Sequence, residues 1–276
     1  MPKDKEFDEL ACLRNENRRL RESLNAHTAP LEVLLKRRGF KVFTKNPGDD
    51  LLLPPEEFID AYYRMLQRYS FRLFLRDVIK HQAFFTTENV ARYAAAEVAA
   101  GYLRYLLSLG VIAETDGGFQ LAGRRVRSFG ETLEWYIAEL LKREFCFESM
   151  WGVKFKRPLV GGDYDVLGKF NGSILYIEVK SSPPKQVYAG EIAAFLGRVS
   201  DLSPEVAVFF MDTELRMKDK IVPLFEAELA KKQAVPPEVT RMEKELFQIG
   251  SRIFIINAKD NIARNLERVL DRYFRR

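Results

Sequence analysis

The sequence contains few of the residues that most often build metal centres and covalent catalytic sites. It has only two cysteines and two histidines in 276 residues. Cys12 and Cys146 supply neither a disulfide framework nor a zinc pattern. His27 and His81 are too few and too far apart for a histidine-based metal site or a Ser-His triad. The sequence therefore argues against disulfide-stabilised, zinc-dependent and serine-hydrolase classes.

Other absences concern location and energy source. No stretch approaches the ~20 apolar residues that a membrane-spanning helix needs. The first residues, MPKDKEFDEL, lack the apolar core of a signal peptide. No G-x-x-x-x-G-K-[ST] motif is present, so the sequence indicates no ATP-driven motor. We therefore expect a cytoplasmic protein without a membrane or ATP partner.

The composition is that of a folded protein with a mild preference for polyanions. Hydrophobic residues make up 47% of the chain, which is enough for sizeable cores. The formal net charge is +5 and the isoelectric point is about 9.0, which suits nucleic acid as a partner. A chain of this length predicts two domains and, here, an additional N-terminal helix.

A β-hairpin is predicted in the stretch GGDYDVLGKFNGSILYIEVKSS, residues 161–182. Asn171-Gly172 is the strongest signal for a two-residue hairpin turn, and β-forming residues flank it. This turn fixes a register in which paired residue numbers sum to 343. Asp165 then lies opposite Glu178, in a pair whose Cα atoms are roughly 4.5 Å apart. Asp163 correspondingly lies opposite Lys180.

Two opposed carboxylates require positive charge nearby. Like charges facing each other destabilise a sheet, and apolar neighbours indicate a partly buried site, where unpaired charge is more unfavourable. Lys180 projects from the same face as Glu178 and supplies part of the charge. Mg²⁺, which binds through one or two carboxylates and phosphate oxygens, would supply the rest. Without metal, we expect the pKa of at least one acid to be raised.

These residues resemble the PD-(D/E)xK nuclease core, also called the restriction-endonuclease-like fold. YDVLG, the turn and YIEVKSS match the strand with the Asp and the strand with Glu-x-Lys, although no Pro precedes Asp165. The match covers about residues 128–211 and predicts an α/β fold with a mixed sheet flanked by helices. We expect the family order α-β-β-β-α-β, followed by an α-β-α extension that includes the strand RIFIINA.

The resemblance implies roles for individual residues. Asp165, Glu178 and the Val179 carbonyl would hold Mg²⁺ or Mn²⁺, and Lys180 would position water or stabilise charge. Family members often carry a Glu on the preceding helix. Glu134 is our candidate for it because Glu134 shares a helical face with Ile137 and Leu141. Alternatives with weaker support are Glu131 in place of Glu134, Asp163 as a further ligand or a partner of Lys180, and Glu191 for a second metal.

A second module is predicted before the nuclease-like core. Three helical patterns precede the hairpin VIAETDGGFQL, and this order resembles a winged helix-turn-helix over about residues 70–123. Thr86 or Thr87 can cap the second helix, and Gly110 ends the third. Such modules bind DNA through a helix in the major groove, and some serve protein interaction or dimerisation instead. The candidate nucleic-acid contacts are Arg104, Arg124, Arg125 and Arg127.

The N-terminus reads in heptads. Leu10, Asn17 and Leu24 occupy a positions, whereas Leu13, Leu20 and His27 occupy d positions. A single Asn at a favours a parallel two-stranded coiled coil, which would make the protein a homodimer. Because fewer than three heptads are present, an amphipathic helix packed on its own chain is the alternative.

The sequence thus predicts an N-terminal helix (1–30), a connecting segment (31–69), a winged helix-turn-helix (70–127) and a nuclease-like domain (128–276). The segment 31–69 carries a basic run, Lys36 to Lys45, whose function is open. The leading functional hypothesis is a metal-dependent DNA endonuclease, with RNA still possible as a substrate. The alternative is a non-catalytic DNA-binding or scaffold protein with a nuclease-like fold.

Overall fold

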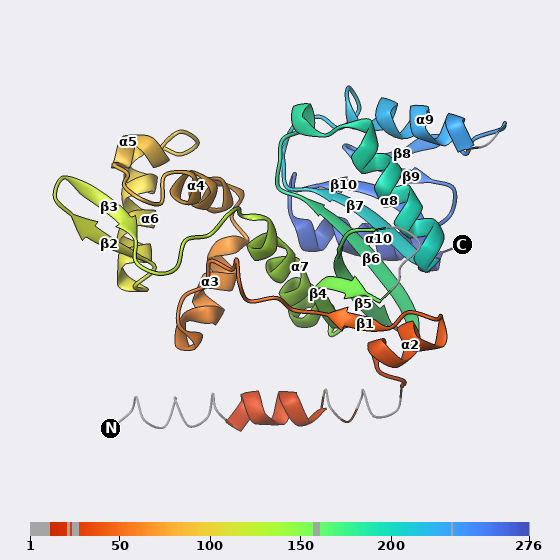
Figure 1. Ribbon diagram of the computed structural model, residues 1–276, viewed down its shortest axis with the longest axis horizontal. Helices are drawn as coiled ribbons and strands as arrows, with labels where there is room; N and C mark the ends of the chain where they lie inside the picture. Colours follow the sequence, from red (N-terminus) through yellow and green to blue (C-terminus); the bar gives the residue numbers. More distant parts are fainter. Residues whose placement is uncertain (1–11, 21–22, 24–27, 157–160, 233, 276) are drawn as a thin grey trace.

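A mixed β-sheet of eight strands forms the centre of the protein (Figure 1). The computed structural model describes all residues except 1–11, 21–22, 24–27, 157–160, 233 and 276. The strand order is β1-β4-β5-β6-β7-β10-β9-β8. The pairs β6–β7 and β7–β10 are parallel, and all other neighbours are antiparallel. The strands are β1 (Val42–Thr44), β4 (Glu148–Phe155), β5 (Tyr164–Phe170), β6 (Ser173–Lys180), β7 (Val206–Met211), β8 (Val239–Glu243), β9 (Leu246–Ile249) and β10 (Ile253–Asn257).

Helices cover both faces of this sheet (Figure 1). Strand β7 is apolar throughout, and its side chains alternate between two buried clusters. Val208 lies in a cluster with residues of α7 (Gly130–Phe145) and α10 (Ile262–Phe274). Phe209 lies in the opposite cluster with residues of α8 (Ala189–Leu202) and α9 (Ile221–Lys232). The predicted α/β class, a mixed sheet flanked by helices, is confirmed, as is the α-β-β-β-α-β order from α7 to β7.

The C-terminal extension is larger than predicted. An α-β-α extension was expected, but β8 and β9 form an additional hairpin that widens the sheet beyond β10. Its turn contains Lys244 with a φ of 46°, a left-handed conformation that the sequence does not mark with Gly or Asn. The prediction was wrong here because the usual turn residues are missing.

The segment before α7 has the predicted sequence of elements. The helices α4 (Tyr69–Lys80), α5 (Thr87–Val90) and α6 (Ala96–Ser108) precede the hairpin of β2 (Ile112–Thr115) and β3 (Gly118–Leu121). Thr86 and Asn89 form a capping box at the start of α5, and Gly110 follows α6 with a φ of 65°. Three helices followed by a hairpin agree with the pattern read from the sequence. Their identification as a winged helix-turn-helix stays a prediction.

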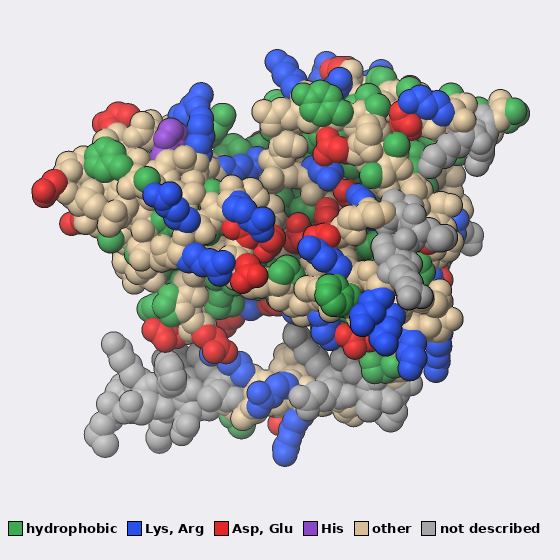
Figure 2. All heavy atoms as spheres, in the orientation of Figure 1, with side chains coloured by type: hydrophobic (Ala, Val, Ile, Leu, Met, Phe, Trp, Pro, Cys, Tyr) green, Lys and Arg blue, Asp and Glu red, His purple; other side chains and the backbone are tan. Residues whose placement is uncertain are grey.

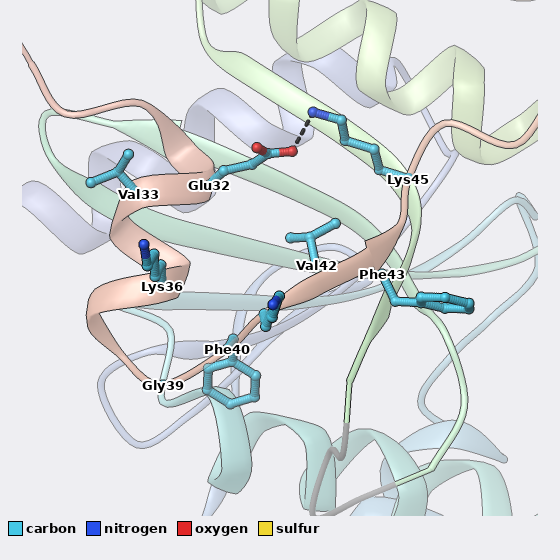
Figure 3. Close-up of a pocket in the computed structure, with 9 residues that line it drawn as sticks. Glu32, Val33, Lys36, Gly39, Phe40, Val42, Phe43 and Lys45 are labelled. Carbon is cyan, nitrogen blue, oxygen red and sulfur yellow. Dashed lines mark hydrogen bonds and ion pairs between the residues drawn. The ribbon is translucent and has the colours of Figure 1, made fainter.

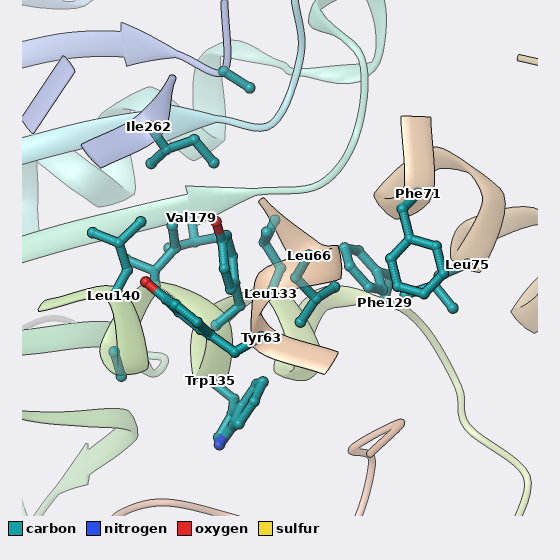
Figure 4. Close-up of a cluster of buried hydrophobic side chains, with 14 of the residues drawn as sticks. Tyr63, Leu66, Phe71, Leu75, Phe129, Leu133, Trp135, Leu140, Val179 and Ile262 are labelled. Carbon is teal, nitrogen blue, oxygen red and sulfur yellow. The ribbon is translucent and has the colours of Figure 1, made fainter. Parts of the chain in front are cut away.

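Buried contacts join these helices to the sheet. Figure 4 shows side chains of α3 (Ile59–Leu66), α4, α7, β6 and α10 in one apolar cluster. Within α4, the fully buried Arg72 donates two hydrogen bonds to Asp212, from Nε at 2.9 Å and from Nη2 at 2.8 Å. Asp212 directly follows β7, and its backbone N–H donates to the Lys180 carbonyl at 2.8 Å. The α4 helix is therefore anchored beside the strand that carries Glu178 and Lys180.

The N-terminal part contributes to the edge of the sheet. Helix α2 (Leu31–Arg37) leads into β1, which pairs with β4.

Residues 12–20 are helical, and Leu13 and Leu20 are exposed. Leu10, Leu24 and His27 of the heptad pattern lie outside the described residues. Arg14 forms an ion pair with Asp60 of α3 at 2.6 Å. Dimerisation through this helix stays a prediction. In the part of the chain that the structure describes, every helix is too short or too polar to cross a membrane.

Candidate active site

The hairpin turn and its register are those predicted from the sequence. Asn171 and Gly172 both have positive φ values, 46° and 78°, as a type I′ turn requires. Strands β5 and β6 pair from Phe170↔Ser173 to Val166↔Ile177, so the sum of 343 holds along the ladder. The next positions along the two strands are Asp165 and Glu178. The turn therefore brings the two predicted acids to the same end of the hairpin.

The regular pairing of β5 with β6 ends at these acids. The Val179 N–H, which would otherwise continue the strand pairing, donates to Asp165 Oδ2 at 2.7 Å. On the other side of β5, the partners are Trp151↔Val166 and Val153↔Tyr164, and the intervening Gly152 has a φ of 55°. The pairing of β5 with β6 therefore ends beside Asp165, whereas β5 stays paired with β4 on either side of it.

Asp163 does not pair with Lys180, and this expectation was wrong. It forms an ion pair with Lys154 of β4 at 3.3 Å. The predicted register does not extend to Asp163, because the β5–β6 ladder ends at the pair Val166↔Ile177.

Cations surround Glu178, whose side chain is only 1% exposed. Lys180 Nζ lies 2.8 Å from Glu178 Oε1, and Arg198 Nη2 donates to both Glu178 oxygens at 2.8 Å. Tyr176 also donates to this carboxylate. Although burial opposes ionisation, the charges of Lys180 and Arg198 lower the pKa of Glu178. Glu178 is thus a charged carboxylate, and its charge in turn raises the pKa of Lys180 against the effect of burial.

Arg198 is a site residue that our sequence analysis missed. It lies on α8, and its Nε also donates to the Tyr176 hydroxyl at 2.8 Å. A signal was present, since Arg198 falls among the apolar residues Phe195 and Val199 on the buried face of a predicted helix. A nearly buried Arg at such a position indicates an acidic partner in the sheet beneath it.

The negative charges of Asp165 and Glu134 are compensated less completely than that of Glu178. Burial and the neighbouring Glu178 raise the pKa of Asp165 to about 8. Burial and the neighbouring Asp165 raise the pKa of Glu134 on α7 to about 9. The prediction that at least one opposed acid has a raised pKa is confirmed. Glu134, not its alternative Glu131, is the helix residue whose pKa is raised by the charge of Asp165. Glu131 instead accepts a hydrogen bond from the Asp50 N–H and pairs with Arg127.

The donors at this point suit a hard divalent cation. Glu134, Asp165, Glu178 and the Val179 carbonyl offer only oxygen atoms, as Mg²⁺ prefers. Burial and neighbouring carboxylates outweigh the nearby cations at Asp165, and burial and neighbouring carboxylates also raise the pKa of Glu134. Among the described residues, no group of three or more His, Cys, Asp or Glu side chains is placed so that it could hold a metal ion. In this arrangement an ion would therefore be held by at most two of the acids, with water and phosphate oxygens completing its shell.

The remaining candidates lie around this centre. Glu191, at the start of α8, accepts a hydrogen bond from the Tyr188 N–H at 3.0 Å and lies 3.5 Å from Lys180 Nζ. It thus helps to hold Lys180 and faces the same centre. In Figure 2, acidic side chains lie in the middle of the molecule between its two halves, bordered by Lys and Arg side chains.

The four predicted nucleic-acid contacts are exposed and lie outside this acidic centre. Arg104 is on α6. Arg124 pairs with Asp49 at 3.3 Å, and the Nε of Arg127 donates to Asp50 at 3.1 Å. Arg125 is also exposed. A role for these residues in binding nucleic acid stays a prediction.

Comparison with solved structures identifies proteins that share the fold. Can2 from Sulfobacillus thermosulfidooxidans, in complex with cyclic tetra-adenylate, is 14% identical with a TM-score of 0.51; the match covers 88% of this chain and 61% of Can2. Protein VC1899 from Vibrio cholerae is also 14% identical with a TM-score of 0.51, and the match covers 90% and 62% of the two chains. No protein-family model and no curated protein matches the sequence. At this identity the likeness concerns the fold, and the match spans about three fifths of each longer chain.

Proposed function

We propose that the protein is a metal-dependent nuclease of the PD-(D/E)xK type that hydrolyses phosphodiester bonds in DNA. The observation that carries this proposal is the placement of Asp165 and Glu178 at the same end of the β5–β6 hairpin beside Lys180. Burial and neighbouring carboxylates raise the pKa of Asp165 to about 8 and that of Glu134 to about 9. An arrangement that only stabilised the fold would pair these carboxylates fully. The net positive charge, and the cyclic oligonucleotide bound by the structural neighbour Can2, also support nucleic acid as the substrate class.

In this proposal Asp165, Glu178 and the Val179 carbonyl hold the ion, and Glu134 completes the site. A bound Mg²⁺ would offset the carboxylate charges and polarise the scissile phosphate. Lys180 stays protonated because its pKa is raised, so its ammonium group orients water or stabilises the developing negative charge and does not act as a base. Arg198 holds the Glu178 carboxylate in place from the side of α8.

One observation favours a second function. Both Glu178 oxygens already accept hydrogen bonds from Arg198, and Lys180 and Tyr176 bind the same carboxylate. A metal ion would have to share this carboxylate with side-chain donors. A DNA-binding or scaffold protein that does not use catalysis is therefore the alternative.

A cleavage screen separates the two functions. Purified protein with Mg²⁺ or Mn²⁺ is tested on linear duplex, branched DNA, single-stranded DNA and RNA, beside Lys180→Ala and the control Lys231→Ala, an exposed lysine of α9. We expect Lys180→Ala to reduce cleavage about 100-fold or more, as loss of a group that stabilises the transition state does, and Lys231→Ala to retain cutting within tenfold. Tight binding of DNA without cleavage of any substrate would favour the alternative. Equal cutting by the wild type and Lys180→Ala would indicate a contaminating enzyme.

A further inference from the structure

An exposed phenylalanine lies among lysines on the edge of the sheet. Alternation along β1 directs Val42 toward the core, whereas Lys41, Phe43 and Lys45 are exposed. Phe43 is 67% exposed, and Lys156, which directly follows the neighbouring β4, holds its Nζ 5.8 Å from the centre of the Phe43 ring. Lys154, which lies on β4, is exposed as well. We refer to Lys41, Phe43, Lys45, Lys154 and Lys156 as the edge strip.

A groove runs beside this strip. Residues of α2 and β1 enclose about 560 Å³. In Figure 3, Val33 and Lys36 of α2 lie on one side, and Phe43 extends from β1 on the other. Glu32 forms an ion pair with Lys45, Lys36 and Lys41 also line the groove, and Lys156 lies beside the Phe43 ring.

Protection of a sheet edge explains only part of this composition. Lysines on an edge strand prevent pairing with other chains. A largely exposed phenylalanine does not serve that purpose, because it adds apolar surface to an edge that should repel partners. Lysines and an exposed aromatic ring together suit a partner with both negative charge and flat aromatic faces. Single-stranded nucleic acid has this combination, since phosphates bind lysines and unpaired bases stack on aromatic rings.

The edge strip leads to the acidic centre. Beyond β1, the Asn46 N–H donates to the Trp151 carbonyl at 2.8 Å, which holds this segment against β4. A Cβ placed on Gly152 would lie 2.6 Å from the Pro47 ring and 3.8 Å from Glu134 Oε2. Lys154 reaches the same centre from β4 through its ion pair with Asp163. One end of the strip therefore adjoins two residues of the acidic region.

We propose that the edge strip binds an unpaired strand of nucleic acid and guides its backbone to the acids at Asp165. A base stacks on Phe43, and Lys41, Lys156 and Lys154 hold phosphates. In a duplex, base faces are covered by neighbouring bases, so Phe43 selects for unpaired strands. Guidance to the acids rests on the proposed nuclease function, but binding by the strip does not.

Fluorescence anisotropy tests this proposal without cleavage. A labelled single strand of twenty nucleotides and the corresponding duplex are titrated with the full chain in EDTA. We expect Phe43→Ala to weaken single-strand binding roughly fivefold or more, since fivefold is the lower end of the range for loss of one stacked base. The control is Phe274→Ala, which removes a phenylalanine that is 55% exposed at the end of α10; it should bind within twofold of the wild type. Duplex binding should change little in either variant.

The lysines are tested through salt dependence. The double variant Lys41→Ala/Lys156→Ala should lower the slope of log affinity against log salt by about 1.4, which corresponds to two phosphate contacts on a single strand. The matched control is Lys218→Ala/Lys220→Ala, two exposed lysines before α9, and its slope should equal that of the wild type. Unfolding temperatures of all variants confirm that they fold.

The outcomes are distinguishable. Single-strand binding by Phe43→Ala equal to that of Phe274→Ala overturns the proposal, as does an equal loss for single strand and duplex. If Phe43→Ala loses single-strand binding while the wild type cuts no substrate, the strip is supported and only the nuclease function fails.

Discussion

Replacing Asp165 by Asn should stabilise the metal-free protein at alkaline pH. Unfolded Asp ionises near pH 3.9, whereas the folded protein holds its proton until a pKa of about 8. Between these values the folded state binds more protons than the unfolded state, so stability falls as pH rises. Asn carries no charge and keeps an oxygen that can accept from the Val179 N–H. Asp165→Asn therefore avoids the loss of stability at high pH and keeps the hydrogen bond from the Val179 N–H.

The size of the effect follows from the shift. From 3.8 to about 8 is a rise of about four units, and each corresponds to ~1.4 kcal/mol, which gives an upper limit of about 6 kcal/mol. Glu134 and Glu178 belong to the same charge equilibrium and redistribute protons when Asp165 ionises. We therefore expect Asp165→Asn to raise the free energy of unfolding by about 1–3 kcal/mol at pH 8.5. This corresponds to about 2–8 °C in unfolding temperature.

The assay is urea and thermal unfolding in EDTA at pH 5.5 and pH 8.5. The wild type should lose stability between these pH values, and Asp165→Asn should lose less. Asp271→Asn is the matched control, because it removes the same charge from a side chain of α10 that is 57% exposed; it should behave like the wild type. If Asp165→Asn is no more stable than the wild type at pH 8.5, the inferred crowding of negative charge is wrong.

Two further predictions concern the neighbours of Asp165. Glu134→Gln should leave metal-free stability at pH 7 within about 0.5 kcal/mol of the wild type, because a carboxyl with a pKa of about 9 is already neutral there; a loss above 2 kcal/mol in urea unfolding would contradict this. Arg198→Met should lower the free energy of unfolding by about 3 kcal/mol, because removing one partner leaves the buried Glu178 charge undercompensated. The exposed Arg104→Met is its control in the same unfolding assay, and equal stability of the two variants would show that Arg198 does not balance Glu178.

Local signals account for the parts of the site that the sequence predicts. The Asn171-Gly172 turn needs positive φ at two successive residues, so it fixes the register of β5 and β6 without information from the rest of the chain. Helical spacing similarly selected Glu134, and the charge of Asp165 is among the causes that raise the pKa of its carboxyl group. Both inferences depend on residues within one element or one turn.

Contacts between distant elements account for what the sequence did not predict. Arg198 contacts Glu178 because α8 packs on the face of the sheet that holds its apolar side chains. The rotation of α8 about its own axis sets the direction of Arg198, and this rotation depends on packing of the whole apolar face. Asp163 turns to Lys154 because the ladder ends early, which depends on β4 as well as the hairpin. The β8–β9 hairpin turns at Lys244 without the residues that normally mark a turn.

Binding of Mn²⁺ to the acids at Asp165 is the most direct test of the account. Calorimetric titration of the wild type, Asp165→Asn and Asp271→Asn at pH 7.5 compares the loss of one carboxylate inside the site with the loss of one on the exposed face of α10. The account predicts binding by the wild type and Asp271→Asn, with proton release from the acids, and at least tenfold weaker binding by Asp165→Asn. Equal affinity of all three proteins, or no binding by the wild type, would contradict it.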